Sequence, residues 1–233
     1  MPGSVTRYLD LLDDQREAIF HELGPLPDAV LWYRPGPRVW SIGEHLDHSR
    51  VVNRFLRRLV IVYYPLASIF ARPFRHRPYK TDIEHILAKP PSYPKSGGRI
   101  FPPKCSPRRP VSVGFLHEAL RAEHAACRRF YTPRDEQLLG HVRLADPLIG
   151  AINLVQLLPI QAYHDAHHYE RVRIRIKEPE YGREAVGGCH QWHPIGGDSV
   201  LLQPEMERRH VRVILQLGRS FSDAKAPQEL HAP

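Results

Sequence analysis

Four segments of the chain repeat apolar side chains at intervals of three and four residues, the spacing that lines one face of an α-helix. They cover residues 4–23, 41–63, 112–131 and 153–176. No convincing strand pattern lies between them. Amphipathic helices bury their apolar faces against one another, so the sequence predicts an all-α fold, a four-helix bundle.

Local signals mark where three of these helices begin or end. Ser41 and Glu44 have the spacing of a capping box, in which two side chains satisfy amide donors at a helix start, and Asn153 and Gln156 repeat that logic. The first helix stops at Gly24, just before a proline. Pro159 lies inside the last helix and is expected to kink it, because proline lacks a hydrogen-bond donor and crowds the preceding turn.

A long basic and proline-rich segment, residues 71–110, joins the second helix to the third. It contains nine of the 23 prolines, and its ten basic and two acidic side chains account for the whole formal charge of +8. The segments on either side are neutral. Repeated proline excludes regular structure from most of the segment, so the sequence predicts a long loop.

The most apolar stretch, residues 59–71, is thirteen residues long and contains Pro65, whereas a membrane-spanning helix needs about 20 apolar residues. We expect it to be the buried end of the second helix, and we expect no membrane partner. The N-terminal residues do not form the unbroken apolar run of a signal peptide. Three cysteines without a C-x-x-C pair suit a reducing compartment, so the expected location is cytoplasmic.

The helical pattern ends near Lys177. Residues 178–233 show frequent glycine and proline and no helical period. The sequence therefore predicts two parts, a helical bundle in residues 1–177 and an irregular C-terminal tail in residues 178–233.

Fifteen histidines are present, and the spacing of two of them is informative. His164 and His168 lie one helical turn apart, where two imidazoles can coordinate the same ion, whereas His167 points about 100° away around the helix. A third ligand must come from another helix. His48 lies at the edge of the buried face of the second helix, and His45 is the rival one turn earlier. The simpler alternative is that His164 and His168 lie on a solvated polar face of the helix. For His45 or His48, it is a hydrogen-bonded histidine in the core.

Two motifs resemble those of the DinB-like (YfiT-like) superfamily of metal-binding four-helix bundles. Residues 40–48 read W-S-I-G-E-H-L-D-H, similar to the family's W-S-x-x-E-x-x-x-H, and the resemblance selects His48 over His45. Residues 146–150 followed by His164 to His168 are similar to the family's P-x-x-G lead-in and H-x-x-H-H helix. The likeness spans residues 4 to about 176. It departs from the family at Arg171, where a Gln is usual, and in the long tail.

Three neutral imidazoles, His48, His164 and His168, leave a coordination position open, which is typical of a catalytic metal site. Imidazole suits Zn²⁺ and Ni²⁺, and the sequence does not choose between them. The resemblance implies thiol chemistry with a low-molecular-weight thiol, or metal-dependent hydrolysis, on a small electrophilic substrate. The alternative is a metal-binding stress or interaction protein without turnover, whose basic loop binds an anionic partner. H-D-x-x-H also resembles the zinc-protease H-E-x-x-H, but Asp is shorter than the catalytic Glu and no strand-rich protease domain follows.

Nearby polar residues are candidates for supporting roles. Asp165 and Tyr163 are candidate catalytic residues for proton transfer, although solvation at the surface is the simpler expectation for Asp165, as helix capping is for Glu44. The loop supplies a candidate anion-binding set, formed by Arg72, Arg75, Arg77 and Lys80, which as a lid would attract an anionic substrate. A solvated loop is the simpler alternative. A homodimer is a candidate assembly, and nucleic acid is not an expected partner.

Overall fold

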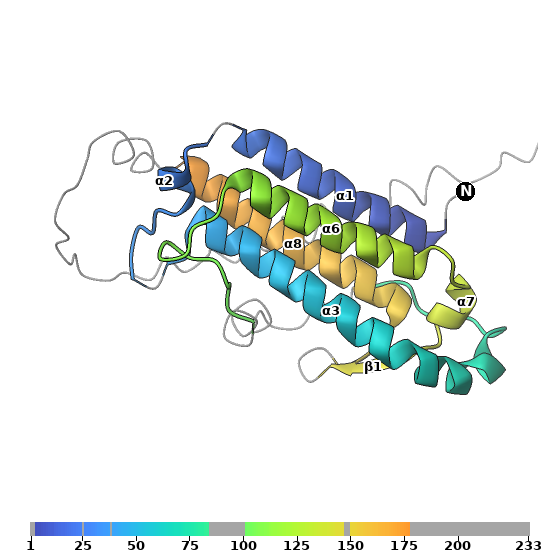
Figure 1. The fold of residues 1–233 in the computed structure, drawn as a ribbon. Helices are drawn as coiled ribbons and strands as arrows, with labels where there is room; N and C mark the ends of the chain where they lie inside the picture. The colour runs from blue at the N-terminus through green and yellow to red at the C-terminus, as the bar shows by residue number, and fades with distance from the viewer. Residues whose placement is uncertain (1–2, 25, 38, 84–100, 147–149, 178–233) are drawn as a thin grey trace, which may run out of the picture. The chain divides into compact units, whose positions relative to one another are not determined.

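The computed structural model describes residues 3–24, 26–37, 39–83, 101–146 and 150–177. Within them, four long helices pack side by side: α1 (Ser4–Leu23), α3 (Ile42–Ala71), α6 (Val113–Tyr131) and α8 (Leu154–Lys177) (Figure 1). α1 and α3 each contact both α6 and α8. Three short helical elements accompany them: α2 (Asp28–Leu31), η1 (Arg72–Phe74) and α7 (Glu136–Leu139). The predicted all-α fold is confirmed, and the predicted tail, residues 178–233, lies outside the described residues.

α1 and α8 run in one direction, whereas α3 and α6 run in the other (Figure 1). Arg54 and Arg57 of α3 both pair with Glu123 of α6, and all three lie at similar depths along their helices. Because α3 and α6 are parallel, the chain between them must travel back along the bundle. The long basic segment predicted as a loop is therefore a crossover connection.

Both predicted capping boxes are present. The Ser41 hydroxyl accepts from the Glu44 amide, and the Glu44 carboxylate accepts from the Ser41 amide. Asn153 and Gln156 make the same reciprocal pair of bonds at the start of α8. A cap of this kind contributes about 1 kcal/mol, so these four residues fix where α3 and α8 begin.

The expectation that no strand is present was wrong. Two four-residue strands, β1 (Arg143–Asp146) and β2 (Gly150–Asn153), pair antiparallel just before α8. Leu144 pairs with Ile152, and both are buried. Strands of four residues are too short to show an alternating pattern, and this hairpin is stabilised by packing on the bundle.

The expectation for the end of the second helix was also wrong. α3 continues through Pro65 to Ala71, well past Tyr63, and much of this stretch faces outward. Val62 is 80% exposed and Phe70 is 69% exposed. The apolar composition of residues 59–71 indicates a helix, but it does not show whether the apolar side chains pack inside the bundle or face outward. Among the described residues, no helix is long and apolar enough to cross a membrane.

The buried core is divided into two apolar clusters with a polar layer between them. One cluster includes Leu9 and Leu12 of α1, and the other includes Ile19 and Phe20 of the same helix. Arg16 lies between them and is 4% exposed. The same interruption occurs in each of the other long helices, at Asn53, His124 and Asp165, all of them buried.

A matched pair of glycine substitutions tests the packing at the start of α3. Gly43 and Gly114 each occupy the second position of a helix. A Cβ at Gly43 would lie 2.8 Å from the buried Trp32 ring, whose Nε1 is held by a hydrogen bond to the Val111 carbonyl, whereas a Cβ at Gly114 meets no atom closer than 3.9 Å. We expect Gly43→Ala to lower the free energy of unfolding by about 1–3 kcal/mol. Gly114→Ala is expected to be neutral or to raise it by up to about 1 kcal/mol. Thermal unfolding of the two variants measures the difference, and equal effects would contradict this account of the Trp32 contact.

Candidate metal centre

Three histidines from two helices meet at one end of the bundle. His48 lies on the second turn of α3, and His164 and His168 lie one turn apart on α8. Each offers one nitrogen to a group in which all three atoms lie within 4.8 Å of one another. All three residues are shielded from solvent: His48 is 1% exposed, His164 is 9% exposed and His168 is 5% exposed. The structure therefore brings together the three histidines predicted from the sequence.

Hydrogen bonds fix which nitrogen of two imidazoles faces the group. His48 Nδ1 lies 2.6 Å from the carbonyl oxygen of Phe101, which can only accept, so Nδ1 carries the proton. His164 Nδ1 lies 3.2 Å from a carboxylate oxygen of Asp165 and donates for the same reason. His48 Nε2 is therefore left with its lone pair, and it lies 3.2 Å from His164 Nε2, so both Nε2 atoms face the group. Partners of this kind hold a ligating imidazole in its binding tautomer.

These distances and charges fit a divalent metal ion. Zinc–imidazole bonds of about 2.0–2.1 Å in tetrahedral geometry place two ligand nitrogens about 3.4 Å apart. Imidazoles must be neutral to bind a metal. Burial lowers the pKa of His48 to about 4, with a further contribution from His164. Burial also lowers the pKa of His168 well below its usual value. All three donors are chemically suited to Zn²⁺ or Ni²⁺.

Two further rings lie against the three histidines. One is His45, the rival ligand in the sequence, whose Nδ1 is 3.1 Å from His168 Nδ1. Trp40, from the W-S-x-x-E motif, places its ring 5.0 Å from the ring of His48 and 6.1 Å from that of His168, centroid to centroid. The Trp40 ring therefore forms an apolar wall against these imidazoles, which limits the access of water from that side.

Asp165 is fully buried, so the expectation that it is solvated at the surface was wrong. Its two carboxylate oxygens accept from Asn53 Nδ2 at 3.1 and 2.9 Å, and one of them also accepts from His164. Burial alone would raise the pKa of Asp165, but contacts with His124 and His164 outweigh it and lower that pKa to about 2. The residue is therefore an ionised, buried orienting group for His164.

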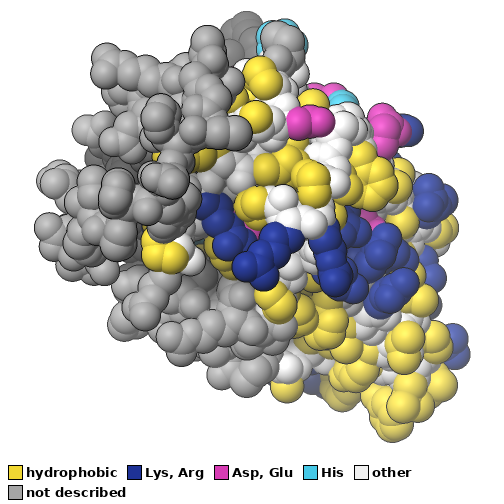
Figure 2. All heavy atoms as spheres, turned by 60° about the vertical axis from the view of Figure 1, so that its left-hand side comes forward, with side chains coloured by type: hydrophobic (Ala, Val, Ile, Leu, Met, Phe, Trp, Pro, Cys, Tyr) yellow, Lys and Arg dark blue, Asp and Glu magenta, His cyan; other side chains and the backbone are white. Residues whose placement is uncertain are grey.

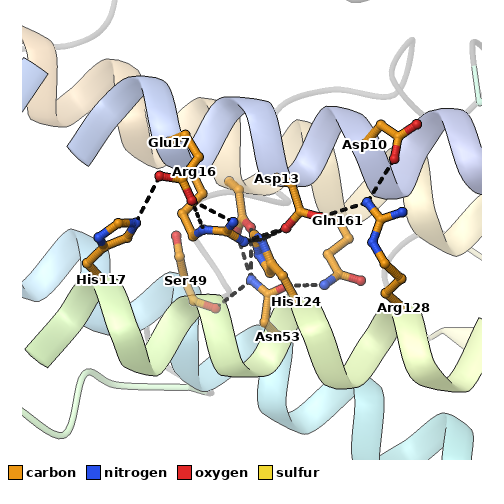
Figure 3. Close-up of polar contacts among 11 residues, drawn as sticks. Asp10, Asp13, Arg16, Glu17, Ser49, Asn53, His117, His124, Arg128 and Gln161 are labelled. Atoms are coloured by element: carbon orange, nitrogen blue, oxygen red, sulfur yellow. Dashed lines mark hydrogen bonds and ion pairs between the residues drawn. The ribbon is translucent and has the colours of Figure 1, made fainter. Parts of the chain in front are cut away.

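The polar contacts of Asp165 continue across the bundle through His124 to Arg16 of α1. Figure 3 shows His124 and Arg16 side by side, with Asn53 and Gln161 next to them. His124 of α6 has its Nε2 3.4 Å from Asp165 Oδ2, and its Nδ1 lies 3.0 Å from Arg16 Nη1. Because a guanidinium only donates, His124 Nδ1 accepts and its proton lies on Nε2, toward Asp165. Arg16 in turn pairs with Asp13 and Glu17. Gln161 donates to the Asn53 side-chain oxygen. We call Arg16, Asn53, His124, Gln161 and Asp165 the polar layer.

The end of the crossover returns to the histidines. Besides the Phe101 carbonyl on His48, the amides of Lys104 and Cys105 donate to a carboxylate oxygen of Asp47, at 2.5 and 2.8 Å. Asp47 is fully buried and also pairs with Arg50. Asp47 thus ties the returning chain to α3 beside His48.

The other predicted site residues lie in different places. Glu44 caps α3 as predicted and also pairs with Arg34. Tyr163 is partly buried, one residue before His164. The anion-binding set begins at Arg72, which is 24 residues and about 36 Å along α3 from His48. The Arg77 carbonyl lies 2.9 Å from a ring nitrogen of His141, and the Lys80 carbonyl accepts from Asn153. Among the described residues, the structure does not bring this set to the histidines, and its role in binding an anionic ligand stays a prediction.

The fold and the site define a class of protein, an all-α chain with a three-histidine group suited to a divalent metal. The chain belongs to the DinB superfamily, whose family model matches residues 11–172. A search of curated proteins and a search of solved structures each found no match. The superfamily predicted from the two histidine motifs is therefore confirmed.

Substitution of the histidines tests the metal centre. We expect the protein to bind about one divalent ion per chain, and His48→Ala or His164→Ala to abolish tight binding because each removes one of three ligands. Elemental analysis after dialysis, with titration of the chelator-treated protein with Zn²⁺ and Ni²⁺, measures this. His167→Ala on the same helix is the control and should keep the metal. Full metal content in both ligand variants would overturn the assignment.

A second pair of variants tests the orienting role of Asp165. We expect Asp165→Asn to weaken metal binding by about 10–100-fold, because His164 loses its charged acceptor. Glu123→Gln is a matched control, since it also alters a buried carboxylate that bridges α3 and α6 but contacts none of the three histidines. Both variants should lower the melting temperature, and only Asp165→Asn should lower the metal affinity. Equal losses of affinity would show a general effect of destabilisation.

Proposed function

We propose that this DinB-superfamily protein is a metal-dependent enzyme that transfers a low-molecular-weight thiol to a small electrophile, or hydrolyses such a substrate. The observation that carries the proposal is the group of three buried histidines, whose ligand atoms all lie within 4.8 Å of one another. Three protein ligands leave at least one position for an exchangeable molecule, as in catalytic rather than closed structural sites. When bound, Zn²⁺ or Ni²⁺ supplies a Lewis acid that lowers the pKa of a coordinated water or thiol.

The protein's own residues supply orientation and exclude water. His48 and His164 are held in one tautomer by Phe101 and Asp165. Asp165 acts through His164, because its oxygens are occupied by Asn53 and by imidazoles. Tyr163 is the candidate for proton transfer to a substrate, since it is partly exposed next to His164. Trp40 shields one side of the histidines.

The cysteines favour an external thiol over a protein nucleophile. Burial raises the pKa of the Cys127 thiol to about 12. Burial also raises the pKa of Cys105, with a further contribution from Asp47. A thiol with a raised pKa carries little thiolate near neutral pH and reacts slowly. Cys189 lies outside the described residues. Neither described cysteine suits attack on an electrophile, which supports a separate small thiol as co-substrate.

A substrate panel tests the proposal. The metal-loaded protein is mixed with small electrophiles, including epoxides, alkyl halides and activated esters, with and without several cellular thiols. Thiol-dependent consumption of an electrophile supports the transferase, and thiol-independent consumption supports the hydrolase. We expect His48→Ala to lose at least about 99% of the activity, and Cys105→Ser and Cys127→Ala to keep most of it. If wild type binds metal but is as inactive across the panel as His48→Ala, the result favours the alternative function, a metal-binding stress or interaction protein without turnover.

A further inference from the structure

The second half of α3 presents a broad apolar surface that the bundle does not cover. Hydrophobic side chains gather at the lower right of Figure 2, beside a band of Lys and Arg side chains. The exposed apolar residues of α3 and η1 from Leu59 onward, each at least 38% exposed, are Leu59, Ile61, Val62, Tyr63, Leu66, Ile69, Phe70 and Phe74. We call these eight residues the α3 face. Single exposed apolar side chains are ordinary, but a contiguous group of this size marks a contact surface.

The spacing of the α3 face shows how it is presented. Leu59, Val62, Leu66 and Ile69 follow one another at intervals of three and four residues, so they form one stripe along the helix. Ile61 and Phe70 widen the stripe on its two sides. An apolar arc of this width along a surface helix is typical of a helix that lies in an apolar–aqueous interface.

The charge along α3 and η1 themselves, beside the α3 face, is of one sign. Residues 48–81 contain no Asp or Glu. Arg54 and Arg57 are paired with Glu123, whereas in the described part of the chain no acidic side chain pairs with the exposed Arg58, Arg72 or Arg75. The Arg77 guanidinium lies over the Phe74 ring, 5.1 Å from its centroid, so basic and apolar groups adjoin at the end of the helix. The surface therefore offers apolar burial next to unneutralised positive charge.

We propose that the α3 face binds the surface of an anionic membrane, with its apolar side chains between the lipid headgroups and its arginines on lipid phosphates. Amphipathic helices of this kind insert about 5–10 Å into the headgroup region without spanning the bilayer. A second copy of the chain fits less well, because a symmetric contact through the same surface would bring like-charged arginines together without acidic partners. Charge complementarity selects the anionic lipid.

This inference goes beyond the proposed function and does not depend on it. Val62 is 14 residues from His48, about 21 Å along α3, so the α3 face can be changed without touching the metal centre. The inference also departs from our expectation of no membrane partner. That expectation considered whether residues 59–71 could span a bilayer, and it placed them inside the core.

The experiment is co-sedimentation of the full-length protein with vesicles. One set contains phosphatidylcholine alone, and the other contains equal parts of phosphatidylcholine and phosphatidylglycerol. We expect binding to the anionic vesicles at low salt, at least about tenfold weaker binding to the neutral ones, and a marked loss as ionic strength rises. Equal binding to both sets, or to neither, overturns the proposal.

Two variants separate the apolar and charged contributions. The triple substitution Val62→Ser, Leu66→Ser, Phe70→Ser should weaken vesicle binding at least about tenfold, because it removes the inserted side chains. Arg72→Gln, Arg75→Gln, Arg77→Gln together should weaken binding to anionic vesicles by up to about 100-fold, since each basic residue near such a surface contributes about fivefold. The altered side chains are exposed, so the helical circular-dichroism signal and the metal content should stay unchanged.

Matched controls and one competing outcome complete the test. Phe115→Ser removes an aromatic side chain that is 51% exposed on α6, and Arg129→Gln removes an exposed arginine of the same helix; both should bind vesicles like wild type. Sedimentation velocity of wild type and of the serine variant reports on a second copy. If wild type is a dimer that the serine variant dissociates, and wild type ignores anionic vesicles, the α3 face is a dimer contact and the proposal fails.

Discussion

The buried charge of Asp165 is the constraint on which the arrangement of the helices depends. A carboxylate removed from water costs several kcal/mol unless donors surround it. Asn53 supplies donors from α3 and His164 from α8, while His124 faces it from α6 and is itself held by Arg16 of α1. A shift of any helix by one turn would leave part of the polar layer without a partner. The layer therefore fixes the register of all four helices, which two apolar clusters alone would not do.

The same layer links the stability of the bundle to the chemistry of the metal centre. His164 belongs to both, because its Nδ1 donates to Asp165 while its Nε2 faces His48. The network extends from the histidines to Arg16, which pairs with the partly exposed acids Asp13 and Glu17. Buried polar groups held in this way are expected to rigidify the site, since each has few other arrangements available. The three histidines are thus positioned by the interior as well as by their own helices.

Features set by local spacing could be predicted from the sequence. The capping boxes and the His164–His168 pair depend on residues within one turn, and His48 followed from a motif nine residues long. The polar layer could not be predicted, because its pairings join helices far apart in the chain. A signal was present nonetheless: Arg16 and His124 occupy positions where the apolar stripe of each helix requires a hydrophobic residue. The exposure of residues 59–71 could not be predicted either, because it depends on how far the other helices extend beside α3, and the sequence of α3 alone does not contain that information.

The crossover between α3 and α6 explains how the polar layer can be assembled. Asn53 and His124 each lie eleven residues beyond the first residue of their helices, and both meet Asp165. α3 and α6 run in the same direction (Figure 1), and parallel neighbours cannot be joined by a short turn. Hydrogen bonds hold both described ends of the crossover: Tyr79 donates to Glu136 of α7, and Asp47 accepts from Lys104 and Cys105 beside His48. The long basic segment is therefore a structural requirement of this site, since it carries the chain back so that α6 begins at the end where the histidines lie.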